Sequence, residues 1–308
     1  MSRDAFSYDP QDIRDTTPRP SPRRLPAAVP DGRSVGGRTP DRSAVPEAGT
    51  PHFLIAERDD SSRGCSVRGR SYSLRDSETH SLTEIGKFRV VAATDLAQYA
   101  YQGDRDRMEK DVRHLKSRSL LNEKTIEVSQ KKLLRVVTLT KGGHRLLRKT
   151  NRIPSDQAIY HGLCRPREVK HDADLYRLYQ KEAARIEQAG GHPLRVLLDY
   201  ELNKDLNRDL ALLGPHQDTE TRKHEIAEKH GLQLVNGKIP VPDLRIEYES
   251  ADLEIRHLDL ELATREYRPK ALLEKAAAGF SLYSRPEDAS RLRRILADRK
   301  FAKGILTL

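Results

Sequence analysis

Residues 104–118 read DRDRMEKDVRHLKSR and decide the fold of the middle of the chain. Met108, Val112 and Leu115 are spaced by four and three residues, so a helix over Asp104–Arg118 would place all three on one face. Such a face would pack against a core and leave the rest of the helix in solvent. The solvent faces carry the basic side chains Arg105, Arg107, Lys110, Arg113 and Lys116.

Two further helices are predicted before this one. The run Ser81-Leu-Thr-Glu84 fits a capping box, in which the Ser side chain caps the helix and the Glu side chain reaches back to its first residue. We therefore place the start of ordered structure at Ser81. A second short helix is predicted at Asp95–Ala100, and Gly103 separates it from the third.

A β-hairpin is predicted after the third helix. Residues 125–139 read TIEVSQKKLLRVVTL, in which two strand-like runs flank a turn that carries Lys131 and Lys132. Thr140 can then cap a last helix. Helix, helix, helix, hairpin and helix is the element order of a winged helix-turn-helix domain, predicted here over residues 81–150. In helix-turn-helix proteins the recognition helix enters the major groove of duplex DNA.

The distribution of charge agrees with a nucleic-acid partner. Residues 81–150 hold 16 basic and 8 acidic residues, a net charge of +8, whereas the whole chain has a net charge of +10. An excess of this kind within one segment is expected for a polyphosphate partner. The sequence therefore predicts duplex DNA as the partner, with a winged helix used for protein contacts as the alternative. The predicted DNA-binding residues are Arg105, Arg107, Lys110, Arg113, Lys116, Lys131 and Lys132.

Composition excludes several other classes of protein. No apolar run approaches the roughly 20 residues of a membrane helix, and the N-terminus lacks the apolar core of a secretory signal. Cys65 and Cys164 are the only cysteines, which argues against a disulfide framework or a structural zinc site. Residues 1–80 hold nine of the 17 prolines and few large apolar residues, so they are predicted to be a disordered tail. We expect a cytoplasmic protein; a homodimer is compatible with the sequence but not required by it.

Residues 151–308 show a mixed pattern of helices and strands. This order predicts an α/β domain with a central mixed sheet and a helical insert at about 203–231, so that the whole chain belongs to the α+β class. The predicted elements are a helix at 172–189, strands at 194–202, 242–248 and 253–263, a helix at 269–280 and a short strand at 280–283.

Acidic residues lie at unusual places in this sheet. Residues 258–262 read LDLEL, so Asp259 and Glu261 share one face of their strand. Asp243 begins the preceding strand, and Glu201 ends the predicted first strand. Carboxylates gathered at one edge repel each other unless a cation compensates them or one takes up a proton. Oxygen ligands suit Mg²⁺ or Mn²⁺, which could activate a water against a phosphodiester.

These segments carry a resemblance to known proteins. Pro242-Asp243, then Glu261, then a helix bearing Lys270 and Lys275, resemble the PD-(D/E)xK nuclease fold in a relaxed form. Residues 81–308 resemble winged-helix proteins of the replication-relaxation type found on mobile elements. The resemblance implies a DNA-binding N-terminal module and a restriction-endonuclease-like C-terminal domain. It is carried by DYEL at 199–202, PDLRIEYE at 242–249, DLELATREYR at 259–268, EKAAAGFSLY at 274–283 and GILTL at 304–308.

The nuclease motif departs from its usual form at one position. The resemblance calls for a lysine two residues after the second acid, where this chain has Ala263. Arg265 or Lys275 would have to supply the cation instead. Two functions therefore remain open: a DNA-binding protein of plasmid or mobile-element maintenance, and a metal-dependent DNA endonuclease. A protein-interaction adaptor is a third class. The candidate catalytic residues are Glu201, Asp243, Glu261, Lys275 and Arg265, with the three acids as metal ligands.

Overall fold

The computed structural model describes residues 62–67, 69–129, 132–150, 152–162, 168–212, 219–298 and 304–308. All of these described residues belong to one compact unit. The predicted tail therefore lies mostly outside the described residues. Within them, no helix is both long and apolar enough to cross a membrane.

Ordered structure begins earlier than the predicted Ser81. Strands β1 (Ser62–Val67) and β2 (Arg70–Arg75) form an antiparallel hairpin, and helix α1 (Asp76–Lys87) follows directly. The carboxylate of Glu78, not that of Glu84, accepts the backbone N–H at the start of the helix, from Arg75 at 2.9 Å. The predicted capping box was wrong because Ser81 lies inside the helix, where its hydroxyl donates to the Ser77 carbonyl.

The winged helix-turn-helix is present in the predicted order. Its three strands form one sheet in the order β3-β5-β4. Asp104 caps α3 by accepting the Arg107 N–H at 2.9 Å, and Met108, Val112 and Leu115 are buried as predicted. The elements after α1 are β3 (Val91–Ala92), α2 (Ala93–Ala100), α3 (Arg105–Ser117), β4 (Leu121–Ser129), β5 (Lys132–Leu139) and α4 (Lys141–Thr150).

The C-terminal part is built on a mixed five-stranded sheet, which confirms the predicted fold class. Its order is β10-β9-β8-β7-β6; β6, β7 and β8 are antiparallel, whereas β8, β9 and β10 are parallel. The elements are α5 (Val169–Gln188), β6 (His192–Leu198), α6 (Asp199–Leu210), α7 (Thr219–Lys229), β7 (Leu244–Glu249), β8 (Ile255–Ala263), α8 (Pro269–Ala277), β9 (Ser281–Ser284), α9 (Pro286–Ala297) and β10 (Leu306–Thr307).

Two predictions in this part were wrong. The first strand ends at Leu198 rather than at 202, because Asp199 and Glu201 stabilise the first turn of α6 and Leu202 and Leu206 give that helix a buried face. Glu201 is therefore a helix residue. Helix α9 was not predicted at all, although Pro286 at its first turn is a common helix start.

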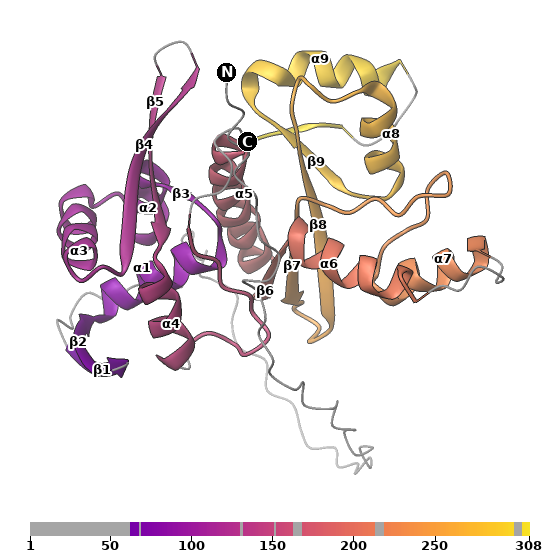
Figure 1. Ribbon diagram of the computed structural model, residues 1–308. Helices are drawn as coiled ribbons and strands as arrows, with labels where there is room; N and C mark the ends of the chain where they lie inside the picture. The colour runs from indigo at the N-terminus through magenta and orange to yellow at the C-terminus, as the bar shows by residue number, and fades with distance from the viewer. Residues whose placement is uncertain are drawn as a thin grey trace, which may run out of the picture. The chain divides into compact units, whose positions relative to one another are not determined.

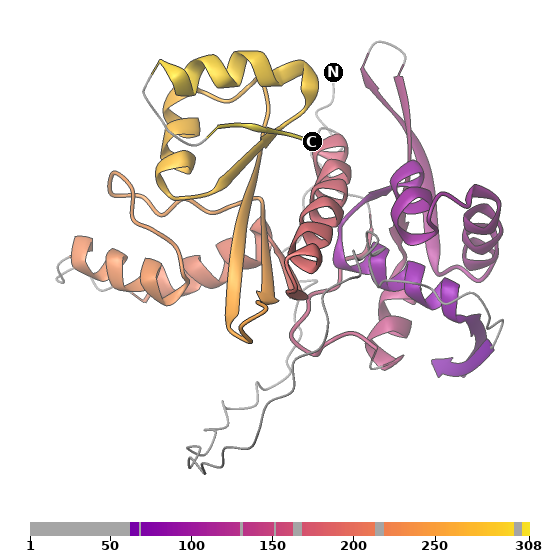
Figure 2. The ribbon, with the colours of Figure 1, turned by 180° about the vertical axis from the view of Figure 1, so that it is seen from behind.

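Helix α5 connects the winged helix to the sheet. It contacts α2 and β3 on one side and β6 and β7 on the other, and both ribbon views place it between the two sets of elements (Figures 1 and 2). The Arg177 side chain of α5 forms hydrogen bonds of 3.0 Å to both carboxylate oxygens of Asp95 in α2. The main hydrophobic core runs through both parts, since Leu115, Tyr176 and Leu260 belong to one buried cluster.

Candidate functional site

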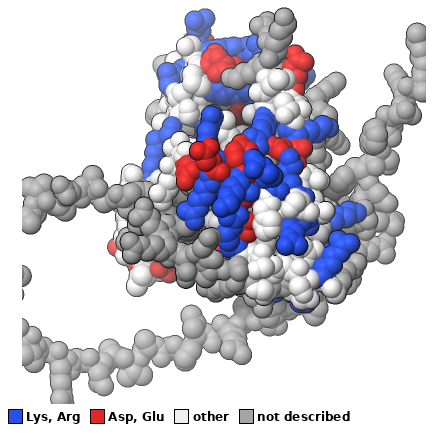
Figure 3. All heavy atoms as spheres, turned by 90° about the vertical axis from the view of Figure 1, so that its left-hand side faces the viewer, with Lys and Arg blue, Asp and Glu red and all other residues white. Residues whose placement is uncertain are grey.

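The outer face of α3 carries exposed cations. Arg105, Arg107, Lys110 and Arg113 are exposed, as predicted, and their side chains make no ion pair with another described residue. Figure 3 views the molecule from the side on which α3 lies in Figure 1, and Lys and Arg atoms gather across the middle of that face. Asp and Glu atoms lie between them, so the surface is mixed but rich in positive charge.

The fifth predicted residue of α3 is different. Lys116 forms an ion pair with Glu123 of β4, so part of its charge is already compensated. Arg135 of β5 also pairs with Glu123, and it donates to Glu109 of α3 at 2.8 Å. These pairs fix α3 against the β4–β5 hairpin and neutralise its acid at position 109.

The predicted hairpin tip is only partly described. Lys131 lies outside the described residues, and Lys132 is the first residue of β5. Their role in DNA binding stays a prediction.

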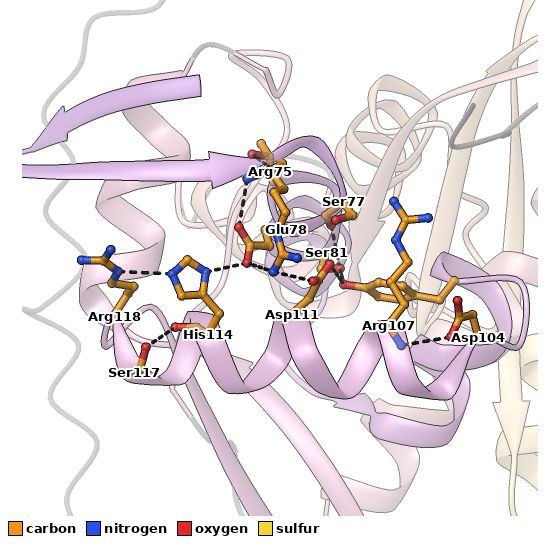
Figure 4. Close-up of polar contacts among 12 residues, drawn as sticks. Arg75, Ser77, Glu78, Ser81, Asp104, Arg107, Asp111, His114, Ser117 and Arg118 are labelled. Carbon is orange, nitrogen blue, oxygen red and sulfur yellow. Dashed lines mark hydrogen bonds and ion pairs between the residues drawn. The ribbon is translucent and has the colours of Figure 1, made fainter. Parts of the chain in front are cut away.

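Buried polar groups hold the inner face of α3 on α1 (Figure 4). The Asp111 carboxylate lies 2.8 Å from the Arg75 guanidinium and accepts the Tyr101 hydroxyl at 3.0 Å. One turn further on, His114 Nδ1 lies 2.5 Å from the Glu78 carboxylate. Burial works to raise the pKa of Glu78, but its bonds to Arg75 and His114 hold that pKa below its usual value. Two contacts one turn apart fix the rotation of α3, and so they fix which side chains face outward.

A second group of polar residues gathers where β7 begins and β8 ends. The Asp243 N–H donates to Glu261 Oε2 at 3.2 Å, and the Leu262 N–H donates to Asp243 Oδ2 at 2.9 Å. Lys275 of α8 donates to the same Glu261 oxygen at 2.9 Å, and Tyr267 donates to the other oxygen. The structure therefore brings together Asp243, Glu261 and Lys275, three of the five predicted catalytic residues.

Asp199 lies beside this group. Its N–H donates to the Asp243 carbonyl at 3.1 Å, and its carboxylate accepts the Arg89 guanidinium at 2.6 Å. We call Asp199, Asp243, Glu261 and Lys275 the carboxylate cluster. Sequence reasoning missed Asp199 because the strand was extended through it; an acid in the first turn of a helix was the available signal.

Burial and neighbouring charges shift the pKa values of the acids in the carboxylate cluster. Burial, and then the neighbouring Asp243, raise the pKa of Glu261 above its usual value against the effect of Lys275. Burial also acts on Asp243, but hydrogen bonding to His171 and its charge hold the pKa of Asp243 down. The pKa of His171 rises to about 10, although burial opposes this, because the carboxylate of Asp172 lies 3.8 Å from one ring nitrogen and that of Asp243 lies 3.2 Å from the other. His171 is therefore a cation at neutral pH.

The other two predicted catalytic residues lie elsewhere. Glu201 accepts the Tyr160 hydroxyl at 3.2 Å and lies 3.5 Å from the Arg195 guanidinium; among the described residues it makes no contact with Asp243 or Glu261. Arg265 pairs with Glu266 on the surface, with its side chain 72% exposed. Asp259 likewise does not join the cluster, since Arg245 binds both of its carboxylate oxygens.

The predicted three-carboxylate metal site is not formed as such. Within the described part of the chain, no three His, Cys, Asp or Glu side chains are arranged to hold one metal ion. Asp243 and Glu261 still supply two hard oxygen ligands at one point of the sheet. Mg²⁺ is commonly held by one or two carboxylates together with water and substrate phosphate. These two residues therefore fit a divalent ion that binds together with a substrate phosphate. They fit a permanently bound ion less well.

Comparison with known proteins adds no argument about this chain. No family model matches the sequence, and no curated protein matches it significantly. Among solved structures, one match is the crystal structure of Bacillus subtilis PadR in complex with operator DNA, with 12% sequence identity. The match covers 51% of this chain and 92% of that one, with a TM-score of 0.22. A similarity of that size carries no argument about function.

Proposed function

We propose that the protein binds duplex DNA by placing α3 in the major groove. One observation carries the proposal: the third helix of the winged helix displays Arg105, Arg107, Lys110 and Arg113 to solvent, and none of them pairs with an acid in the described part of the chain. A helix with its side chains is about 10–12 Å across, which fits the major groove. Cations at these positions would reach phosphates or base edges, and the contacts of Asp111 and His114 hold them outward.

The test is the salt dependence of binding to a labelled duplex, measured by fluorescence anisotropy. The double variant Lys110→Gln/Arg113→Gln should weaken binding and reduce the slope of log affinity against log salt by about two units, since each lost phosphate contact removes about one. Arg291→Gln/Arg294→Gln is the matched control, because both residues are exposed, three apart and on the distant helix α9. The control should keep the wild-type slope.

Two outcomes would count against DNA binding. If the wild-type protein shows no salt-dependent affinity for duplex at low ionic strength, the winged helix serves another partner, such as a protein. If the α9 control loses as much slope as the α3 variant, then binding reflects overall charge, and α3 is not the recognition element.

We propose phosphodiester cleavage as a second function, favoured by the convergence of Asp243, Glu261 and Lys275. Asp243 and Glu261 would hold a divalent ion that enters with the DNA phosphate. When bound, such an ion supplies Lewis-acid stabilisation and a more acidic water. Lys275 would bind an oxygen of the DNA phosphate.

Cleavage is tested on supercoiled plasmid with Mg²⁺ or Mn²⁺. Asp243→Asn and Glu261→Gln keep the size of each side chain and should abolish nicking. Glu201→Gln is the discriminating control, because Glu201 lies outside the carboxylate cluster and its loss should leave nicking intact. Mn²⁺ should also raise the Tm of the wild-type protein but not of Asp243→Asn. Absence of nicking and of this Tm shift would leave the cluster a purely structural feature.

We propose, on the replication-relaxation resemblance alone, that the bound duplex belongs to a plasmid or mobile element. Selection of bound fragments from mixed chromosomal and element DNA should enrich the element. Sedimentation of the complex would give the number of protein copies, and a homodimer would require two half-sites about one helical turn apart. Enrichment of chromosomal fragments would contradict the assignment to an element.

A further inference from the structure

Helix α4 has a basic face that the proposed function does not use. Gly143, Leu146 and Leu147 are buried, whereas Arg145 and Arg148 are exposed, three residues apart. From position 128 to position 155 the sequence has eight Lys and Arg residues and no Asp or Glu. A surface of mixed charges would be expected for an ordinary solvated helix.

The positive charge at the start of α4 is unfavourable for the free protein. Lys141 begins α4, where the helix dipole disfavours a cation, and the first turn contains no acid. Like charges three or four residues apart also repel, as Arg145 does with Lys141 and Arg148. Arg145 and Arg148 have no ion-pair partner among the described residues. A polyanion bound to this face would relieve the repulsion.

The start of α4 is fixed on the turn that ends α3. The Thr140 hydroxyl donates to the Ser119 carbonyl at 2.7 Å, and the Thr140 N–H donates to the Leu120 carbonyl at 3.0 Å. A Cβ atom at Gly143 would lie 2.3 Å from the Leu120 carbonyl oxygen, so only glycine permits this approach. The basic face of α4 is therefore held in a fixed position relative to the C-terminal end of α3.

We propose that the exposed face of α4 binds the phosphate backbone of the same duplex, beside the segment that α3 enters. The inference rests on the proposed DNA binding and extends its contact surface by about 15 Å, the length of a ten-residue helix. Duplex DNA carries one charge per about 1.7 Å of its axis, so a helix of this length faces several phosphates. The contacts would be sequence-independent and would add affinity and orientation rather than specificity.

The experiment compares three double variants of the full chain on one duplex over a range of salt concentrations. Arg145→Gln/Arg148→Gln should reduce the slope of log affinity against log salt by about two units. Arg145→Lys/Arg148→Lys keeps the charge and should keep the slope. Arg291→Gln/Arg294→Gln on α9 should behave as wild type. Each single variant, Arg145→Gln or Arg148→Gln, should lose about one unit, which secures the result if the double variant fails to fold.

The outcomes separate this inference from the function on which it rests. If the α3 variant loses slope and the α4 variant does not, α4 makes no phosphate contact and only the inference fails. If the wild-type protein does not bind duplex, both fail together. If the α4 variants lose slope while their far-ultraviolet circular dichroism and Tm match the wild type, the α4 contact is established.

Discussion

The two candidate sites treat charge in opposite ways. On α3, Arg105, Lys110 and Arg113 face solvent and form no ion pair with another described residue. In the carboxylate cluster, the buried Glu261 and the partly exposed Asp199 and Asp243 are met by cations from three parts of the chain. These cations are Arg89 in the loop before β3, His171 on α5 and Lys275 on α8. Uncompensated charge on a surface is available to an external partner, whereas compensated buried charge first of all serves the fold. A charged residue therefore indicates a binding site only when its charge is not already compensated within the protein.

Polar contacts join the winged helix to the C-terminal part. The Arg89 guanidinium lies 3.5 Å from Asp172 of α5 and 2.6 Å from Asp199 of α6. The Gln157 side chain accepts the Val196 N–H and donates to the Val196 carbonyl, so the segment after α4 is bonded to β6. The winged helix therefore supplies one of the cations that neutralise the acids around the cluster. Substitutions in the carboxylate cluster should therefore lower the free energy of unfolding, and substitutions of the exposed cations on α3 should not.

The largest effect is expected for Lys275→Ala. Glu261 has no exposed surface, and removal of Lys275 would leave its carboxylate without the ion-pair partner, although the Asp243 N–H and the Tyr267 hydroxyl would still donate to it. Breaking a buried ion pair on one side costs about 3–5 kcal/mol, so urea denaturation at pH 8 should show a loss of that order. The loss should shrink at pH 5, where Glu261 takes up a proton.

Lys270→Ala is the control, since Lys270 lies on the same helix but is exposed. It should change the free energy of unfolding by less than about 0.5 kcal/mol. Equal losses in both variants would mean that α8 needs its lysines for helix formation, not for charge compensation.

A smaller effect, of opposite sign, is expected for Glu201→Gln. Burial raises the pKa of Glu201 to about 7, despite the Arg195 guanidinium and the Tyr160 hydroxyl. A carboxyl with a raised folded-state pKa gives stability that is complete below its unfolded pKa, about 4.5, and is lost as the pH rises to about 7. Glutamine does not titrate, so the variant should gain about 2–3 kcal/mol on the wild type between pH 4.5 and pH 8.

This prediction is checked by urea denaturation of both proteins at several pH values. Parallel stability curves would show that Glu201 is ionised in the folded protein throughout this range, paired with Arg195. The measurement also sharpens the boundary of the carboxylate cluster, because Glu201 was expected within it and contacts Tyr160 and Arg195 instead.

Local pattern was enough to predict the winged helix and the faces of α3. Spacings of three and four fix which side chains are buried, and that rule needs no knowledge of distant residues. The spacing of neighbouring strands allowed Asp243 and Glu261 to meet if the register was right, and the antiparallel pairing of Leu244 with Leu260 gives that register. Lys275 came from the family resemblance and could not have been chosen over Arg265 by spacing alone.

The sequence could not supply the long-range partners. Strand β6 ends at Leu198, four residues before the predicted end, so Asp199 rather than Glu201 lies in the carboxylate cluster. The apolar residues of 194–202 are compatible with a strand that ends at either 198 or 202. His171 and Tyr267 come to the carboxylate cluster from different elements, through packing of α5 and of the loop after β8. Arg89 is a single arginine between two apolar runs, and only the tertiary structure shows what it compensates.

The smallest effect on stability is expected for Lys110→Gln/Arg113→Gln, and it separates the two regions most sharply. Neither residue has an ion-pair partner among the described residues, so the double variant should unfold within about 0.5 kcal/mol of the wild type. Relief of repulsion between cations three residues apart could make it slightly more stable. The same variant is expected to lose about two units of salt slope in DNA binding. If it instead lost several kcal/mol of stability, these cations would stabilise the fold, as those of the carboxylate cluster do. The distinction between an exposed surface that binds a partner and a buried network that stabilises the protein would then not hold here.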